Sequence, residues 1–290
     1  MSRLLHFICN TLSSKINPLG AFSLCVLLFV LSACATQNVA DRIESSKRIA
    51  TNAGFESIII NAPQFSLQAF IQPQIKVDIL SIYIEGDGHA WRNSQTPSDD
   101  PTPINPIALK LALKDPRLGV AYLGRPCQYL GAQYSKNCDE MVWTDRRFSP
   151  EVVAASNFAI DQLKDRYHAK KVKLIGYSGG GAIALLVAAN RTDVDRVITV
   201  AGNIDTRAWV SHHRLRPLLG SLNPADFAKQ LVTIPQIHYV GGRDEVVPAL
   251  VAKSYVAKFP QNQRPAIHMI NDYAHVCCWV EGRLDINADH

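Results

Sequence analysis

Three polar residues of this sequence have the types that acyl transfer through a serine requires. Ser178 stands at the centre of the pattern Gly-Tyr-Ser-Gly-Gly, and Asp244 and His275 follow it in chain order. A serine hydroxyl is a weak nucleophile at neutral pH, so it needs a base within hydrogen-bonding reach. An imidazole base in turn needs a carboxylate that holds its tautomer and stabilises its cation. The three residues predict attack by Ser178, proton transfer by His275 and orientation of His275 by Asp244.

The residues around Ser178 predict a sharp turn between a strand and a helix. A short apolar run from Val172 ends on this turn, and a helix of small residues follows from Gly180. Glycines allow backbone conformations and close approaches that other residues cannot adopt. The turn exposes the hydroxyl and places it at a helix N-terminus, where free N–H groups stabilise a developing oxyanion. The alternative is that Ser178 serves only as a helix N-cap.

Other residues compete for the acid and base positions. Glu245 lies beside Asp244, and Asp205 follows an earlier apolar run. The other histidines considered as the base are His89, His212, His213, His238 and His268. His238 and His268 lie within apolar runs and are expected to fill the core or the surface, whereas His89 is expected to line the pocket.

The apolar pattern predicts eight short strands separated by helical stretches. The predicted strands cover 58–60, 65–71, 79–84, 120–123, 172–177, 197–201, 237–240 and 267–270, and the predicted helices 106–114, 150–167, 180–190 and 248–259. Strands that alternate with helices at this spacing favour a mostly parallel sheet with helices on both faces. We therefore predict an α/β fold with an eight-stranded sheet.

In such a sheet the functional residues usually lie at the carboxyl ends of the strands, where the loops converge. Polar residues stand at these ends after several predicted strands. The third strand is followed by Glu85-Gly86-Asp87-Gly88-His89, the fifth by Ser178, the seventh by a turn that contains Asp244, and the eighth by a turn that contains His275. We expect these residues to meet at one edge.

With these motifs in this order, residues 55–285 resemble the α/β-hydrolase superfamily, in which the nucleophile, acid and histidine follow in that order. The resemblance implies Ser178 as nucleophile, Asp244 as acid, His275 as base, and no metal or organic cofactor. It also implies an oxyanion hole from the N–H of Gly179 and a second N–H in the glycine turn, assigned to Asp87. The chain departs from the family in that turn, where Glu85-Gly86 replaces the common His-Gly pair.

The first 33 residues have the pattern of an export signal, with Arg3 and Lys15 ahead of a short apolar core. The core is shorter than the roughly 20 residues that span a membrane. Leu31-Ser32-Ala33-Cys34 resembles the lipobox of bacterial lipoproteins, which implies a lipid on Cys34 and, with Ala35 next, the outer membrane of a Gram-negative cell. The protein is then expected in the cell envelope, facing the periplasm. An uncleaved signal anchor is the alternative.

The cysteines and the charge restrict the class of protein. Four cysteines remain beyond the signal and Cys34, and an even number in an exported protein indicates disulfides. We prefer a bridge between Cys127 and Cys138, which leaves Cys277 and Cys278 as a vicinal disulfide or as buried thiols. A zinc site is disfavoured because ligand spacing is missing. The net charge of +5 without a basic run does not suggest a nucleic-acid partner.

Three parts are predicted along the chain: a signal peptide over 1–33, a polar tether with some helix over 34–54, and a single hydrolase domain over 55–290. The stretch from about 202 to 234, which contains Trp209, is expected to form a small cap over the site, or alternatively a plain helix with a buried tryptophan.

The predicted function is hydrolysis of an ester or related acyl bond of a small-molecule or lipid substrate. One alternative is a catalytically silent envelope lipoprotein that uses the fold as a binding module. Others keep the fold and cleave a peptide, a thioester or a carbon–halide bond, and the last is disfavoured because it usually needs an aspartate in place of Ser178.

Overall fold

The computed structural model of the chain describes residues 38–73, 75–131, 136–282 and 284. In these residues all eight predicted strands form, and they pair into one sheet. The strands are β1 (Glu56–Asn61), β2 (Ser66–Ile71), β3 (Ile79–Ile84), β4 (Val120–Leu123), β5 (Lys171–Tyr177), β6 (Val194–Val200), β7 (Gln236–Gly241) and β8 (Ala266–Ile270). The eight-stranded sheet predicted from the apolar runs is therefore confirmed.

The strand order is β1-β2-β4-β3-β5-β6-β7-β8, so the chain crosses over after β3 and returns to add β5 on its other side. The pairs β3–β4, β3–β5, β5–β6, β6–β7 and β7–β8 are parallel, while β2 runs antiparallel to both β1 and β4. The carboxyl ends of β3, β5, β6, β7 and β8 therefore lie along one edge of the sheet. This arrangement brings loops from distant parts of the chain together.

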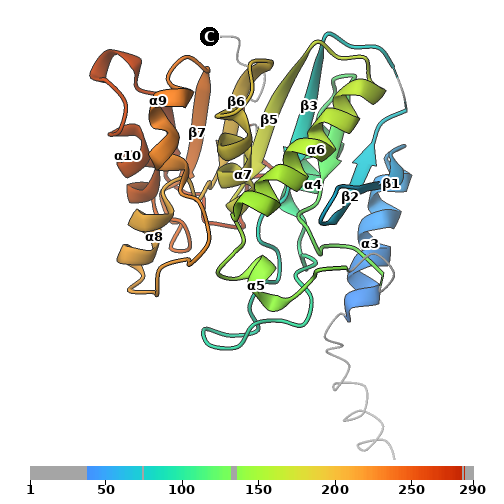
Figure 1. The fold of residues 1–290 in the computed structure, drawn as a ribbon, viewed down its shortest axis with the longest axis horizontal. Helices are drawn as coiled ribbons and strands as arrows, with labels where there is room; N and C mark the ends of the chain where they lie inside the picture. The colour runs from blue at the N-terminus through green and yellow to red at the C-terminus, as the bar shows by residue number, and fades with distance from the viewer. Residues whose placement is uncertain (1–37, 74, 132–135, 283, 285–290) are drawn as a thin grey trace, which may run out of the picture. The chain divides into compact units, whose positions relative to one another are not determined.

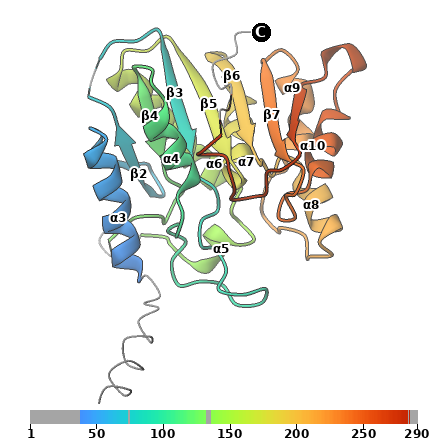
Figure 2. The same ribbon diagram turned by 180° about the vertical axis from the view of Figure 1, so that it is seen from behind.

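Helices cover both faces of the sheet. On one face the core includes residues of α6 (Pro150–Arg166), α7 (Gly179–Ala188) and α10 (Ala249–Val256), and on the other it includes α3 (Val39–Asn52) and α4 (Ile107–Lys114). Figure 1 shows α6 and α7 in front of the sheet, and Figure 2 shows α4 on the opposite side. The shorter elements are α5 (Glu140–Trp143), α8 (Thr206–His212), η2 (Pro224–Phe227), α9 (Ala228–Leu231) and η3 (Gln261–Gln263).

The strand side chains alternate between the two faces, as the pleat requires. In β3, Leu80 and Ile82 point into the core beneath α6 and α7, whereas Tyr83 belongs to the core beneath α4. In β5, Leu174 belongs to the core beneath α6 and α7, and Ile175 belongs to the core beneath α4. Because both faces are buried, these strands read as nearly continuous apolar runs, which is why the sequence predicts them well.

Within the predicted polar tether over 34–54, the structure forms a helix from Val39 onward. Helix α3 occupies most of this stretch, and its residues Arg42, Ser46 and Ala50 are buried. The Arg42 guanidinium donates to the carbonyl of Thr102, and Ala50 belongs to the core beneath α4. Much of the buried face of the helix is polar, as Arg42 and Ser46 show. Hydrophobic periodicity therefore does not predict that this helix packs against the rest of the domain. Residues 34–37, including Cys34, lie outside the described residues.

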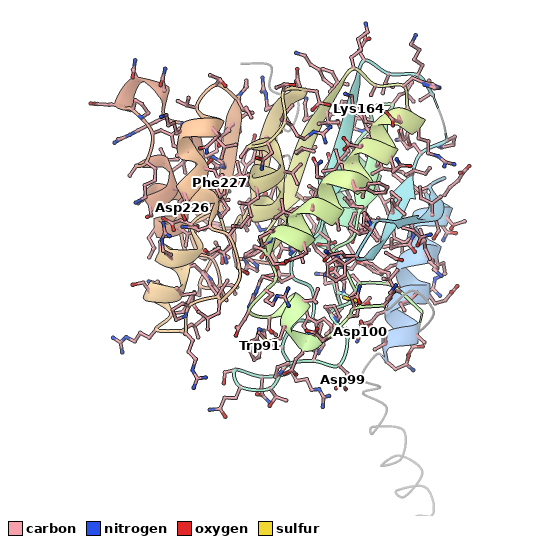
Figure 3. All side chains as sticks on the ribbon, viewed as in Figure 1. Trp91, Asp99, Asp100, Lys164, Asp226 and Phe227 are labelled. Carbon is pink, nitrogen blue, oxygen red and sulfur yellow. A yellow bond between two sulfur atoms is a disulfide. The ribbon has the colours of Figure 1, made fainter. Side chains whose placement is uncertain are left out.

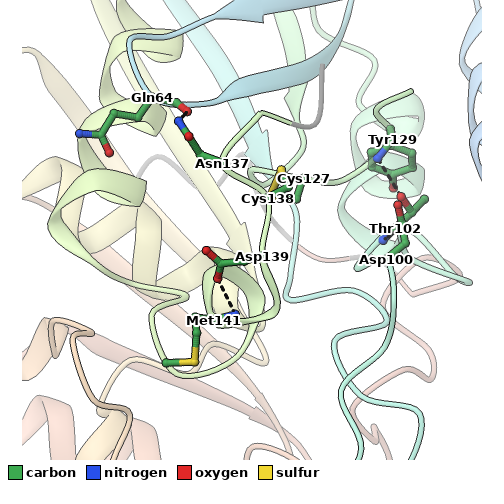
Figure 4. The surroundings of a disulfide bond; sticks show 9 residues. All are labelled: Gln64, Asp100, Thr102, Cys127, Tyr129, Asn137, Cys138, Asp139 and Met141. Atoms are coloured by element: carbon green, nitrogen blue, oxygen red, sulfur yellow. Dashed lines mark hydrogen bonds between the residues drawn. A yellow bond between two sulfur atoms is a disulfide. The ribbon is translucent and has the colours of Figure 1, made fainter. Parts of the chain in front are cut away.

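A disulfide joins Cys127 to Cys138, as the cysteine spacing predicted. The bridge closes the loop after β4, and nearby Asp139 accepts a hydrogen bond from the N–H of Met141 at the start of α5 (Figure 4). Cys277 and Cys278 also form a vicinal disulfide. Cys277 is exposed, so the alternative of two buried thiols is wrong.

The stretch predicted as a cap, from about 202 to 234, contains α8, η2 and α9. Its Trp209 is only half-buried, so the alternative of a plain helix with a buried tryptophan does not fit. Among the described residues, no helix has both the length and the apolar character needed to cross a membrane.

Candidate active site

Ser178 lies on a strained turn between β5 and α7. Its φ is 51° and its ψ is −121°, a combination that non-glycine residues rarely adopt. The glycines on either side are required by close approaches. A Cβ on Gly176 would lie 2.3 Å from the carbonyl oxygen of Gly180, and one on Gly180 would lie 2.2 Å from that of Ile84. The pattern around Ser178 therefore folds as the sequence predicts, with the hydroxyl at the N-terminus of α7. Its side chain caps no N–H of α7, so the N-cap alternative does not explain the residue.

The three sequence-predicted residues meet in a chain of hydrogen bonds. His275 Nε2 lies 3.0 Å from Ser178 Oγ, and His275 Nδ1 lies 2.8 Å from Asp244 Oδ2. The Asp244 side chain is fully buried, and that of His275 is 13% exposed. A buried carboxylate on Nδ1 favours the tautomer in which Nε2 is free to accept the serine proton.

Asp244 is held by the backbone of its own loop. Its Oδ1 accepts from the N–H of Val246 at 2.9 Å and from that of Val247 at 2.7 Å. The other oxygen is left to face His275. Two backbone donors on one oxygen fix the orientation of the buried carboxylate.

The backbone of His275 is held by two aromatic side chains. Tyr177 Oη and Trp279 Nε1 each donate to the His275 carbonyl at 2.9 Å. Tyr177 directly precedes Ser178, and Trp279 is buried beneath the loop. The loop after β8 is thus attached to the strand that carries the serine.

The competing residues have other roles. Asp205 caps α8 by accepting from the N–H of Ala208, and it also accepts from Ser254 Oγ. Glu245 is exposed beside Asp244. The remaining histidines divide between the pocket wall (His89), the α8 region (His212, His213), the core (His238) and the exposed side of β8 (His268).

The glycine turn after β3 lies against the serine turn. A Cβ on Gly86 would lie 3.2 Å from the Cβ of Ser178, so the two turns are in contact. The N–H of Gly86 donates to Glu85 Oε1 at 2.9 Å and is occupied. The next N–H along the turn, that of Asp87, and the N–H of Gly179 are the two candidates for an oxyanion hole.

Glu85 is a buried carboxyl group beneath the turn. It accepts from the N–H groups of Ala108 and Leu109 at the N-terminus of α4 and from Tyr122 Oη, in addition to Gly86. Burial raises the pKa of Glu85 to about 7, against the lowering effect of these donors. The unusual acid at this position is 1% exposed and anchors the turn through these hydrogen bonds.

A pocket of about 360 Å³ opens at Ser178 and His275. Its wall includes Asp87, His89, Trp91, Arg147 and Trp209. Figure 3 shows Trp91, with Asp99 and Asp100, at the lower end of the molecule, away from Lys164 at the other end. Arg92 pairs with Asp99, so that acid forms a surface ion pair.

Two further residues, Trp209 and Arg147, also line this pocket, and sequence reasoning pointed only to Trp209, within the expected cap. Trp209 of α8 donates from Nε1 to the carbonyl of Val246 at 2.7 Å, which attaches α8 to the loop that carries Asp244. Arg147, which sequence reasoning missed, lines the pocket and pairs with Asp87. Arg125 also pairs with Asp87. Arg125 follows β4 by two residues, and this position at a strand end was the available signal.

Within the described part of the chain, no group of three or more His, Cys, Asp or Glu side chains is placed to hold a metal ion. The side chains that the structure brings together at the site are those of Ser178, His275 and Asp244.

Comparison with known proteins shows the family to which the chain belongs. A model of the dienelactone hydrolase family matches residues 128–276, which include Ser178, Asp244 and His275. The chain belongs to the dienelactone hydrolase family. Its fold is that of the α/β-hydrolases, as the sequence resemblance implied. The family match begins after the turn that contains Glu85 and Asp87, so that turn is described by the structure alone.

Solved structures share this fold at low sequence identity. An α/β serine hydrolase homologue from Coxiella burnetii has a TM-score of 0.50 and 20% identity, and the match covers 76% of this chain and 89% of that one. An esterase from Pyrococcus furiosus has a TM-score of 0.55 and 12% identity, with 79% and 85% covered. An acylaminoacyl peptidase from Pyrococcus horikoshii has a TM-score of 0.54 and 12% identity, with 77% and 38% covered. No curated protein sequence matches the chain significantly.

Proposed function

We propose that this member of the family is a serine hydrolase that cleaves an ester bond through an acyl-enzyme. The observation that carries the proposal is the hydrogen-bonded chain from Ser178 through His275 to Asp244, with distances of 3.0 and 2.8 Å. The hydrogen-bonded chain lies at the mouth of a pocket, near the backbone N–H groups of Gly179 and Asp87. The names of the family and of the Pyrococcus furiosus esterase agree with ester chemistry.

The geometry supports a two-step reaction. Ser178 Oγ attacks the ester carbonyl while its proton passes to His275 Nε2, and Asp244 stabilises the imidazolium. The N–H groups of Gly179 and Asp87 hold the oxyanion. The C–O bond then breaks and His275 returns the proton to the departing alcohol. Water, activated by His275, attacks the acyl-enzyme in the same way and releases the acid.

The reaction is tested with the purified protein and a panel of aryl and alkyl esters, thioesters and anilides of matched acyl groups. Ser178→Ala is expected to lose ester hydrolysis, and Ser156→Ala, a buried serine of α6 that donates to Val152, is expected to keep it. Higher activity on anilides than on esters would indicate a peptidase. Ester hydrolysis that survives in Ser178→Ala would refute the proposal.

A correctly folded protein that reacts with no fluorophosphonate probe would instead indicate a silent binding module. The ordered chain of Ser178, His275 and Asp244 argues against this reading, because a binding module has no need of that geometry.

We further propose that Cys34 carries a lipid and anchors the protein in the cell envelope, on the periplasmic side of the outer membrane. The sequence pattern before Cys34 supports this. Metabolic labelling with a palmitate analogue tests it: Cys34→Ser is expected to lose the label, while Cys25→Ser keeps it. Lipid label that persists in Cys34→Ser would exclude this anchor.

A further inference from the structure

The carboxylate of Asp87 lies directly beside the proposed oxyanion hole. A Cβ on Gly179 would come within 2.0 Å of Asp87 Oδ1, so the carboxylate packs against the residue that follows the nucleophile. Gly179 is the first residue of α7. The carboxylate thus occupies the region where the positive end of the helix and the N–H of Gly179 would act on a developing negative charge.

An unpaired carboxylate at this place would oppose catalysis. Charges a few ångströms apart interact strongly in a partly buried site, and like charges repel. A carboxylate beside the hole would therefore raise the energy of the oxyanion relative to the neutral ester. Because the ester carries no such charge before attack, the repulsion would slow the chemical step more than it weakens substrate binding.

Two buried arginines hold this carboxylate, one at each oxygen. Arg125 Nη1 lies 3.1 Å from Asp87 Oδ1, and Arg147 Nη1 lies 2.9 Å from Asp87 Oδ2. Both arginine side chains are 6% exposed, against 18% for Asp87. The cluster has a formal charge of +1, since two guanidinium groups face one carboxylate. In a buried environment these interactions are little screened by salt.

The arginines are themselves fixed by contacts outside the pair. Arg125 donates from Nη2 to the carbonyl of Arg147, and its guanidinium lies over the ring of Phe148, 5.3 Å from the centroid. Arg147 donates from Nε to the carbonyl of Thr144 and lies 5.8 Å from the ring of Trp209. The positive charges are held in place before any substrate binds, which is the condition for electrostatic preorganisation.

We propose that Arg147, together with Arg125, is a positioning residue that neutralises Asp87 beside the oxyanion hole and thereby makes the acid in this turn compatible with catalysis. The inference rests on the proposed function, because it assigns the hole to the N–H groups of Gly179 and Asp87. It explains why the chain tolerates an aspartate there.

A double-mutant cycle tests the proposal with steady-state kinetics on an aryl ester. Arg147→Gln leaves Asp87 with one arginine and is expected to lower kcat about 10- to 100-fold with little change in KM. Asp87→Asn removes the charge that needs neutralising and is expected to have a smaller effect. The double variant Arg147→Gln/Asp87→Asn is expected to be at least about five-fold faster than Arg147→Gln alone. Arg147→Lys, which keeps the charge, is expected to recover part of kcat.

A matched control separates this role from a general loss of packing. Arg191 is also a buried arginine, 7% exposed, paired with two carboxylates, Asp161 and Asp193. It lies after α7 and away from the pocket. Arg191→Gln is expected to lower the melting temperature while kcat of the folded protein stays within about two-fold of wild type.

The outcomes distinguish the inference from the proposed function. If Ser178→Ala abolishes hydrolysis and the double variant is as slow as Arg147→Gln or slower, the proposed function stands and the role of Arg147 is overturned. If Arg147→Gln raises KM alone, the arginine binds substrate and the inference is also overturned. If Ser178→Ala remains active, the proposed function itself fails, whatever the cycle shows.

Discussion

Tyr177, the last residue of β5, donates a hydrogen bond from its hydroxyl to the carbonyl of His275 over a distance of 2.9 Å. The residue next to the proposed nucleophile thus holds the loop that carries the proposed base. The rings of the two residues also lie near each other, with centroids 5.4 Å apart. The spacing between Ser178 and His275 therefore depends in part on the Tyr177 side chain, which belongs to neither residue.

Replacing Tyr177 with phenylalanine is expected to reduce kcat about three- to ten-fold, because small misplacements of a catalytic group slow the chemical step. Loss of the hydrogen bond should also lower the free energy of unfolding by about 1 kcal/mol. Steady-state kinetics and urea unfolding measure the two effects.

The control is Tyr255→Phe, which removes a buried hydroxyl that donates to Gln236 Oε1 at 2.7 Å, away from the site. It should have a similar effect on stability and none on kcat. An unchanged kcat in Tyr177→Phe would mean that the loop after β8 keeps its place without this contact.

Asp244→Asn is expected to lower kcat by about 10⁴-fold, as loss of the carboxylate does in comparable triads. The side-chain oxygen would stay on the N–H groups of Val246 and Val247, so the amide nitrogen would face His275 Nδ1. That contact forces the proton onto Nε2, which then cannot accept the proton of Ser178.

Two neighbouring variants serve as controls for Asp244→Asn. Glu245→Gln changes an exposed acid beside it and should leave kcat unaltered. Asp205→Asn removes charge from the cap of α8 and should reduce stability rather than kcat. A large loss of kcat in Asp205→Asn with activity retained in Asp244→Asn would assign the acid to the end of β6.

Gly176→Ala is expected to prevent accumulation of folded protein, because the new Cβ would lie 2.3 Å from the backbone carbonyl of Gly180 in a region with no room to shift. Gly54→Ala is the comparison. Gly54 has a φ of +80° but open space around it, so alanine there should destabilise by only about 1 to 2 kcal/mol. Thermal melts of the soluble fractions compare the two. Equal melting temperatures would contradict the tight packing of the serine turn.

His238 is expected to cause part of the loss of folding stability at acidic pH. It is fully buried in β7, with Nδ1 2.8 Å from Thr199 Oγ1, and burial lowers its pKa from 6.5 to about 3. The unfolded chain therefore binds a proton below pH 6.5 that the folded chain rejects. The free energy of unfolding should fall as the pH drops from 6.5 towards 3, with a slope of at most about 1.4 kcal/mol per pH unit from this residue.

Urea unfolding between pH 3 and 8 of the wild type and His238→Gln measures this slope. The variant should lose that part of the pH dependence, while the exposed histidine variant His268→Gln should retain it. Glu85 has the opposite effect on the pH dependence of stability. Because its pKa rises from 4.5 to about 7 on folding, its contribution to the free energy of unfolding decreases as the pH rises from 4.5 to 7. Comparing variants at each pH cancels this second effect. Identical slopes in the wild type and His238→Gln would contradict the prediction.

The strands and the positions of the three residues were predictable from local pattern. Buried parallel strands such as β5 appear as apolar runs, and a polar residue directly after such a run falls at the edge where loops converge. Ser178 follows β5 directly, whereas Asp244 is the third residue after β7 and His275 the fifth after β8, so all three fall in loops at that edge. Helix boundaries were also predictable from local sequence. Helix α6, for example, begins after a serine cap that is followed by Pro150.

Features that depend on long-range polar contacts were not predictable in this way. Helix α3 buries Arg42 against the carbonyl of Thr102, 60 residues later, so its sequence looks like that of an exposed segment. The arginines on Asp87 come from 38 and 60 residues further along the chain. No periodicity encodes such a pairing, because the partners meet only when β3, β4 and α5 have assembled.

The most direct test of the central claim is to trap the acyl-enzyme and locate the acyl group. The protein is mixed with a slowly deacylating aryl ester, quenched in acid and measured by intact mass and peptide mapping. The account predicts one added acyl mass, on Ser178, that is formed by the wild type and by Ser156→Ala but not by Ser178→Ala. Acylation on another residue, or hydrolysis at full rate with no adduct on Ser178 under single-turnover conditions, would contradict it.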